Sequence, residues 1–153
     1  MQQLLDLVNQ LALQIPNATK QQTSVSEGAV GWHIEHSLLV ITQIIEGVKR
    51  SDASKYKWRF NFSRLIILGL NKIPRGKAKA PQSVVPNSDL SEEALLASIA
   101  KTKLALQELT NCEKNNYFIH PYFGQLNLPA TIRFFEVHTY HHLKIIRDIL
   151  KCS

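Results

Sequence analysis

The sequence contains little that could cross-link the chain or span a bilayer. Of its 153 residues only two are cysteines, Cys112 and Cys152, which lie far apart and match no zinc or redox spacing. This pattern argues against a disulfide framework and favours a reducing, cytoplasmic location. No apolar run approaches the roughly 20 residues of a transmembrane helix, so we expect no membrane partner. The N-terminal segment has no basic region ahead of its apolar residues, so we expect no signal peptide.

Strand signals are equally scarce. Apart from a short extended piece at Val84 and Val85, no segment alternates apolar and polar residues between turn signals. There is no internal repeat. The apolar share of 44% and the charged share of 20% are close to the averages for globular proteins, which argues against disorder. We therefore expect one folded domain over residues 1–153, built from helices.

Helical periodicity is what the sequence has in abundance. Four main segments carry apolar residues at three- and four-residue intervals: 1–13, 26–50, 88–111 and 129–151. Ser26 is predicted to cap the second helix and Ser88 or Ser91 the third, while Pro129 suits the first turn of the last. The pattern predicts an all-α fold, a four-helix bundle with a long irregular connection between its second and third main helices.

That connection is the least regular and most basic part of the chain. A short helix is predicted over residues 62–70, and Pro74, Gly76 and Pro81 break any regular element after it. Loops this long are often functional or pack across the rest of the fold. Much of the net charge of +6 lies between residues 49 and 79. An anionic partner such as nucleic acid would explain this charge, but a solvated basic loop is favoured because no nucleic-acid motif accompanies it.

Histidines provide the strongest functional signal. Five of the six fall in two places, GWHIEHS and EVHTYHH. On the last helix His138 and His142 interrupt an apolar stripe, where aliphatic residues would pack better. Their spacing of four stacks both rings on one helix face, within reach of a single divalent metal ion. His141 points about a hundred degrees away from His142 and is expected to contact solvent or a neighbouring group instead.

A third histidine is expected from the second helix. The apolar stripe through Val30, Val40 and Ile44 favours His33, while His36, three residues further on, could share that face. Three histidines leave at least one coordination position open, as in catalytic or ligand-binding metal sites. Three imidazoles suit zinc, nickel, iron or copper.

Three segments carry a resemblance to a known family. SEGAVGWHIEHS (26–37), HPYFG (120–124) and HTYHHL (138–143) resemble the DinB/YfiT-like superfamily of metal-binding four-helix bundles, in particular an uncharacterised branch with an H-P-x-F-G segment before the last helix. The resemblance implies that His33, His138 and His142 bind a divalent metal, with zinc or nickel favoured. Many relatives place Arg, Gly or Gln where this chain has Leu143, Lys144 and Ile145 after the double histidine.

The resemblance also implies a function. Characterised relatives are similar to metal-dependent thiol transferases and hydrolases that act on small molecules, so we expect an enzyme of that kind. The alternative is a non-enzymatic binding module with a structural or vestigial metal site, whose basic loop 72–81 contacts an anionic partner. A homodimer through exposed helix faces is compatible with either hypothesis.

Several further residues have both a functional and a structural interpretation. The groups near the histidines that could transfer protons are expected to face sideways or outward; they are Glu35, Glu136 and Tyr140. Large aromatic residues usually serve burial. We therefore expect segment 120–124 to clamp the start of the last helix rather than line a pocket with His120, and Trp32 and Trp58 to be packing residues.

Overall fold

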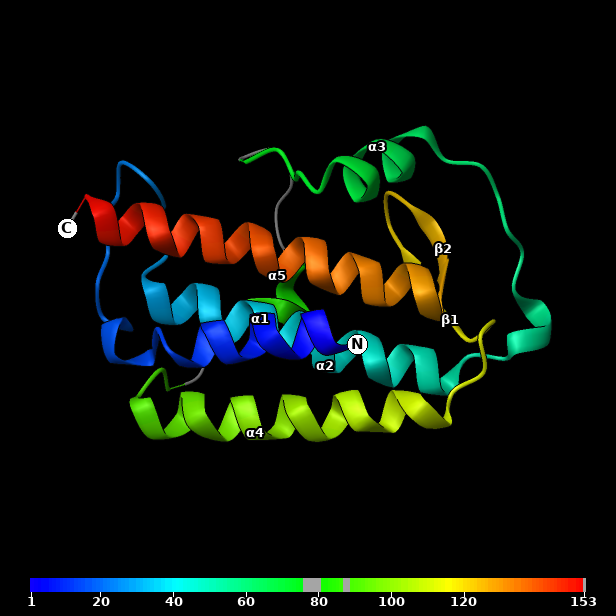
Figure 1. Ribbon diagram of the computed structural model, residues 1–153, viewed down its shortest axis with the longest axis horizontal. Coiled ribbons are helices and arrows are strands. Elements are labelled where there is room, and N and C mark those ends of the chain that lie inside the picture. Colours follow the sequence, from blue (N-terminus) through cyan, green and yellow to red (C-terminus); the bar gives the residue numbers. More distant parts are fainter. Residues whose placement is uncertain (76–80, 87–88, 153) are drawn as a thin grey trace.

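The computed structural model describes residues 1–75, 81–86 and 89–152, and most of them are helical (Figure 1). The long elements are α1 (Gln2–Ala12), α2 (Val30–Arg50), α3 (Phe62–Leu70), α4 (Glu92–Glu108) and α5 (Leu128–Lys151). Four 3-10 turns connect them: η1 (Ile15–Asn17), η2 (Ala53–Lys55), η3 (Gln82–Val84) and η4 (Leu109–Asn111). The predicted helical segments are therefore confirmed to within a few residues, with one exception at the start of α2.

Local side-chain caps explain where three of these helices begin. Ser91 Oγ accepts a hydrogen bond from the Ala94 amide at the start of α4, as one of the two caps considered. The other, Ser88, lies outside the described residues. Asn127 caps α5 through its side chain, and the first turn of that helix contains proline, as expected. Asn61 caps α3 in the same way.

The predicted cap of α2 is wrong. The helix begins at Val30, four residues after Ser26, and its N-cap residue is Ala29. The first amides of α2 need no serine because backbone carbonyls of the preceding turn satisfy them: the Val30 amide donates to Lys20 O at 2.9 Å and the Gly31 amide to Ala18 O at 2.8 Å. This leaves Ser26 available for another contact, described below.

The central element of the fold is α2. It packs against α4 on one side and α5 on the other, and α1 completes the arrangement by contacting α4 and α5. Figure 1 shows these four helices running side by side along the long axis of the molecule. Most residues of α2 are buried, including Glu35 and both of its histidines. The first part of α2, residues 30–41, is therefore in contact with protein around nearly its whole circumference.

A small β-hairpin corrects the all-α prediction. Strands β1 (Tyr117–His120) and β2 (Gly124–Asn127) pair antiparallel, with His120 opposite Gly124. The fold is therefore mostly helical with one hairpin, in the segment predicted to be an aromatic turn. Its short strands carry too few alternating residues to be distinguished from a turn. Val84, expected to be extended, lies in η3.

The connection between α2 and α4 folds back over the helices, as its length suggested. Val84 is buried in the core, and the Arg133 guanidinium donates to the Leu68 carbonyl, which holds α3 against α5. In contrast, Trp58 is 67% exposed, so its expected role as a packing residue is wrong. Along the described parts of the chain, we find no helix whose length and hydrophobicity would let it traverse a bilayer.

Two glycines provide a test of the hairpin and of α2. Gly124 has φ +71°, a conformation that costs an L-residue about 1 kcal/mol or more, so we expect Gly124→Ala to destabilise the protein by about that amount. Gly47 lies within α2 with open space around the position of a Cβ. Gly47→Ala should therefore stabilise by about 0.5–1 kcal/mol. Urea unfolding of both variants measures the difference, and a Gly124→Ala variant as stable as the wild type would contradict the hairpin geometry.

Candidate metal centre

Three histidines from two helices converge beneath the connection. Nitrogen atoms of His36 on α2 and of His138 and His142 on α5 all lie within 4.8 Å of one another. The His138 and His142 ring centroids are 4.6 Å apart, as expected for residues one turn apart on a helix. The ring of His36 lies 4.7 Å from His142 and 5.2 Å from His138. This arrangement presents three imidazole nitrogens to one point.

The orientation of His36 is fixed by a backbone carbonyl. Its Nδ1 lies 2.7 Å from the Val84 carbonyl oxygen, which can only accept a hydrogen bond, so Nδ1 carries the proton. The lone pair of the neutral ring is therefore on Nε2. The Trp32 ring stacks on the His36 ring, with centroids 4.9 Å apart and planes at 11°. Metal-binding histidines commonly have such a carbonyl partner behind them.

His138 carries a buried nitrogen without a partner. Its Nδ1 is shielded from solvent and has no hydrogen-bond partner among the described residues. A buried polar atom in this condition costs free energy of about 1–3 kcal/mol. A divalent cation shared with the neighbouring imidazoles would satisfy it, so the donor set fits a metal ion.

His33 lies beside this cluster rather than within it. Its Nδ1 is 2.9 Å from His142 Nδ1, and its Nε2 is 2.9 Å from Ser26 Oγ. The Gly28 amide also donates to Ser26 Oγ. With a proton on His142 Nδ1, that nitrogen donates to His33, which in turn donates to Ser26, and His142 Nε2 keeps its lone pair. The assignment of His33 as a ligand, implied by the resemblance, stays a prediction.

The two remaining histidines make other contacts. His141 is buried and meets the His142 ring edge-on, with centroids 5.2 Å apart, so it contacts a neighbouring histidine rather than solvent. His120 Nδ1 accepts from the amides of Tyr122 and Phe123 in the hairpin turn. Its ring stacks on Phe123 at 4.2 Å. Phe123 is buried, in keeping with the predicted clamp, whereas Tyr122 is exposed.

All six histidines are electrically neutral at pH 7. Burial, with smaller contributions from nearby positive groups, lowers the pKa of His33 and His141 to about 4. Burial alone lowers the pKa of His120 to about 4, and it is the main cause of the lowered pKa of His36. Burial and neighbouring histidines hold the pKa of His138 and His142 well below 6.5. Protons therefore do not compete with a metal for these nitrogens near neutral pH.

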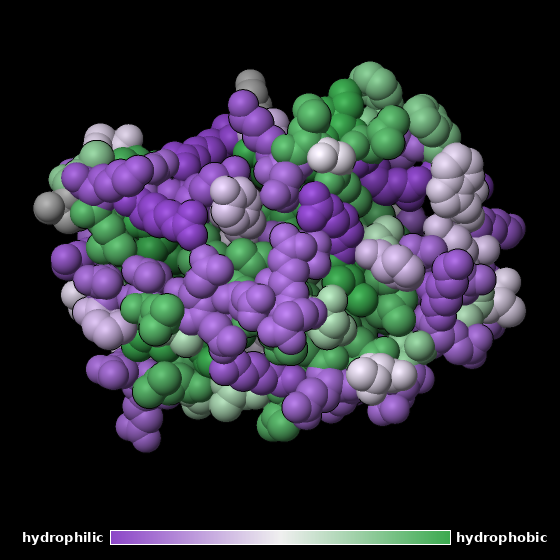
Figure 2. All heavy atoms as spheres, viewed as in Figure 1, coloured by the Kyte–Doolittle hydropathy of each residue, from purple (hydrophilic) through white to green (hydrophobic). Residues whose placement is uncertain are grey.

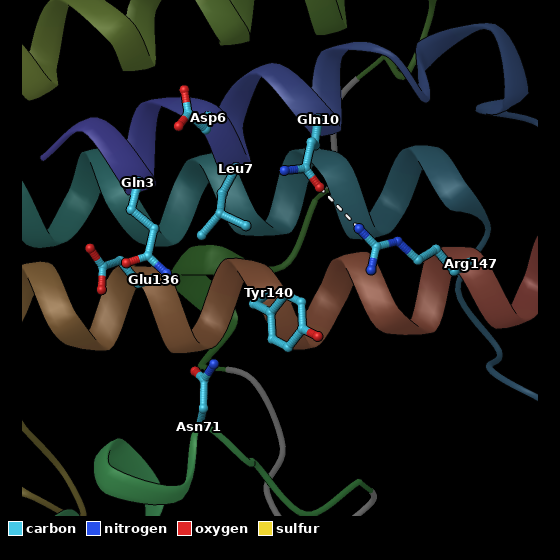
Figure 3. Close-up of a pocket in the computed structure, with 8 residues that line it drawn as sticks. All are labelled: Gln3, Asp6, Leu7, Gln10, Asn71, Glu136, Tyr140 and Arg147. Atoms are coloured by element: carbon cyan, nitrogen blue, oxygen red, sulfur yellow. Dashed lines mark hydrogen bonds between the residues drawn. The ribbon is translucent and has the colours of Figure 1, made fainter.

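The candidate proton-transfer groups lie elsewhere. Glu136 and Tyr140 line a pocket of about 420 Å³ between α1 and α5, together with Asn71 and Arg147 (Figure 3). The figure shows the Arg147 side chain reaching across to Gln10, with which it shares a hydrogen bond of 3.0 Å. Residue 136 lies about 200° around the helix from residue 138, so this pocket and the histidines are on different faces of α5.

Glu35 is the third of these groups, and it is buried against α4. Ser98 hydrogen-bonds to its carboxylate, but its Oε2 has no hydrogen-bond partner among the described residues. Burial raises the pKa of this carboxyl, and the Ser98 hydrogen bond and Lys101 partly offset the effect. In the described parts of the chain, no carboxylate hydrogen-bonds to a histidine of the cluster.

Two residues that hydrogen-bond to the histidines, Val84 and Ser26, could not be recognised in that role from the sequence. Val84 contributes a backbone carbonyl, which every residue has, so its side chain gives no signal. Ser26 was expected to cap α2, whereas its hydroxyl hydrogen-bonds to His33. The spacing of seven residues between Ser26 and His33 places them together only because the intervening chain turns before α2 starts.

Comparison with known proteins identifies one family. The sequence model of the DinB superfamily matches residues 2–146, nearly the whole chain. No curated protein and no solved structure matches.

The buried neutral histidines predict a loss of stability in mild acid. The pKa of His33 and His141 is about 4 in the folded protein and about 6.5 in the unfolded chain, so the unfolded chain binds more protons below pH 6.5. We expect the free energy of unfolding of the metal-free protein to fall by about 2 kcal/mol or more between pH 7 and pH 5.

Urea unfolding at several pH values measures this loss. The range from pH 7 to pH 5 lies above the pKa of most carboxyl groups, so their titration contributes little. The variant His33→Gln should show a smaller pH dependence than the wild type, because one of the shifted groups is gone. A free energy of unfolding that stays constant from pH 7 to pH 5 would contradict the buried, neutral state of these rings.

Proposed function

The chain belongs to the DinB superfamily, and we propose that it binds one divalent metal ion through His36, His138 and His142. The observation that carries this proposal is the convergence of their nitrogens to within 4.8 Å, with His36 oriented by the Val84 carbonyl. On the same grounds we propose that α1, α2, α4 and α5 constitute the four-helix bundle of that superfamily.

His36 is preferred to His33 as the ligand from α2 for two reasons. The Nδ1 of His36 is already occupied by a carbonyl, which leaves Nε2 for the metal. Both nitrogens of His33 are instead engaged, one with Ser26 and one with His142. His33 then acts as a positioning residue: its Nδ1 accepts a hydrogen bond from the Nδ1–H of His142 and so fixes the tautomer of that ligand.

Three neutral imidazoles suit zinc or nickel and leave a coordination position open. A metal ion bound there would act as a Lewis acid and lower the pKa of a water or thiol held next to it. Aromatic side chains help to bury the site. The Trp32 ring stacks on His36, and the ring centroids of Phe134 and His138 are 5.6 Å apart. We therefore propose a metal-dependent transferase acting with a thiol, or a hydrolase, with a small-molecule substrate. Both cysteines are free, which fits a reducing, cytoplasmic location.

One observation favours the alternative, a binding module with a structural metal. The three candidate proton-transfer side chains do not join the histidine cluster. A reaction at this site would take its protons from solvent or substrate rather than from Glu35, Glu136 or Tyr140. The basic loop gives this alternative less support than its charge suggested, because Arg75 pairs with Asp148 of α5 at 2.7 Å.

The choice of ligands can be tested by metal affinity. We expect His36→Ala, in protein purified without a histidine tag, to lose stoichiometric zinc binding, because one of three ligands is removed. His33→Ala should keep one zinc per chain with an affinity about 10–100-fold weaker, as expected for a residue behind a ligand. Competition with a chromophoric chelator measures both constants.

The neighbouring His141→Gln is the matched control, since it removes a buried histidine that we do not place among the ligands. Circular dichroism confirms that each variant is folded. If His33→Ala loses zinc while His36→Ala retains it, the ligand assignment is wrong. If all variants bind as the wild type does, the metal site itself is wrong.

Catalysis can be separated from binding by an activated ester. We expect zinc-loaded wild-type protein to hydrolyse p-nitrophenyl acetate at least about a hundredfold faster than the metal-free protein, because water at the open position becomes nucleophilic near neutral pH. The His138→Ala variant should show the metal-free rate. A loaded protein that binds zinc tightly but gives no rate above the metal-free form would favour the binding module.

A further inference from the structure

The charge of this protein is concentrated in one segment. Residues 53–88 contain eight lysine and arginine residues and no aspartate or glutamate, which gives the segment a formal charge of +8. The rest of the chain has ten basic and twelve acidic residues, a formal charge of −2. Two acids border the segment, Asp52 and Asp89, and Asp52 is 3.4 Å from Lys55. The net charge of the protein therefore comes entirely from this connection.

The same segment exposes large apolar side chains. Six of them are between 39% and 70% exposed, and we call them the apolar patch: Trp58, Phe60, Phe62, Leu65, Ile66 and Leu70. Figure 2 shows hydrophobic residues gathered over α3 at the upper right of the molecule. Monomeric proteins rarely leave so many neighbouring large apolar side chains in water without a partner for them.

The patch is held on a fixed support. On its inner face α3 packs Ile67 and Leu68 against the core, so the face that carries Phe62, Leu65 and Ile66 points away from the protein. Ile66 is the fourth residue after Phe62, which is the spacing of one helix face. The outward face of α3 is thus apolar as well as the inward one.

Hydrogen bonds join the extended segment before α3 to the hairpin. The Lys57 amide donates to Gln125 Oε1, and Asn61 Nδ2 donates to the Tyr122 carbonyl. The Arg64 guanidinium donates to the Arg59 carbonyl and lies 6.0 Å from the Trp58 ring. These contacts hold Trp58 and α3 in one surface, next to the exposed ring of Tyr122.

We propose that this surface docks the protein on an anionic phospholipid bilayer, with the apolar patch inserted at the level of the headgroups and the surrounding cations on the lipid phosphates and carboxylates. Interfacial helices combine an apolar face bearing tryptophan, phenylalanine and leucine with lysine and arginine at its border. Each basic residue near an anionic leaflet adds to the attraction. The expectation of no membrane partner was based on the lack of a spanning segment, which this mode of binding does not require.

Charge and composition favour a bilayer over two other partners. A second copy of the chain would bring two surfaces of the same positive sign together, which opposes association. Single-stranded nucleic acid would use the aromatic rings and the cations, but it offers no apolar environment for the aliphatic side chains of Leu65, Ile66 and Leu70. A lipid interface accommodates all three classes of side chain. The patch and the histidine cluster use different residues, so this proposal does not depend on metal binding.

Sedimentation with sucrose-loaded vesicles tests the proposal with the full chain. We expect binding to phosphatidylcholine vesicles that contain about 30 mol% phosphatidylserine, weaker binding as salt rises, and little binding to pure phosphatidylcholine. Lys57→Gln with Arg59→Gln should weaken binding about 30-fold, since each basic residue near the surface contributes roughly fivefold. Leu65→Ser with Leu70→Ser should weaken it at least about tenfold.

Matched controls use exposed residues elsewhere on the protein. Leu13→Ser with Leu104→Ser replaces leucines that are 73% and 62% exposed, and Lys20→Gln with Lys114→Gln removes the same charge; both should bind as the wild type does. Absence of vesicle binding, or equal loss in the controls, would overturn the proposal. So would a dimer in solution, or binding to labelled single-stranded DNA, that the patch substitutions abolish while the vesicles remain unbound.

Discussion

The hydrogen bond from His36 Nδ1 to the Val84 carbonyl is the contact on which the geometry of the histidine cluster depends. It sets the tautomer of His36, so the lone pair of that ring is on the nitrogen that can bind a metal. It also fastens the connection between α3 and α4 to the helical core, because Val84 is buried in η3. One bond therefore couples the orientation of a ligand to the path of a long loop. Loss of η3 from its place would leave His36 without the partner that orients it.

Periodicity predicted the helices because their apolar faces are long and their caps are local. Ser91, one of the two serines predicted as caps, caps α4. The stripe of α5 that includes His138 and His142 was recognisable because these two polar residues interrupt it. The choice between His33 and His36 could not be made in this way. Both side chains are buried, since the first part of α2 is surrounded by protein on nearly every side. A stripe distinguishes helix faces only when one face is polar. Both histidines contact α5, and the tertiary path of the chain decides which of them joins His138 and His142 in the cluster.

The features missed from the sequence have no distinctive local pattern. The hairpin at residues 117–127 pairs two strands of four residues, too short for alternation to appear. Trp58 was expected to be packed because large aromatics usually are, yet its surroundings place it in water. The two ends of the connection between α2 and α4 therefore differ in their chemistry. Its η3 end contacts His36 of the buried cluster. Its α3 end instead presents apolar and basic side chains to solvent.

We propose that His36 binds the metal and that His33 orients the ligand His142 through a hydrogen bond. Nitrogen-15 NMR of the histidine rings during a zinc titration tests it most directly, because the ring nitrogens report separately on protonation and metal binding. At one equivalent of zinc, we expect the Nε2 resonance of His36 to shift to a metal-bound value, while both nitrogens of His33 keep the shifts of a hydrogen-bonded neutral ring. A metal-bound nitrogen on His33, with the His36 ring unchanged, would contradict it.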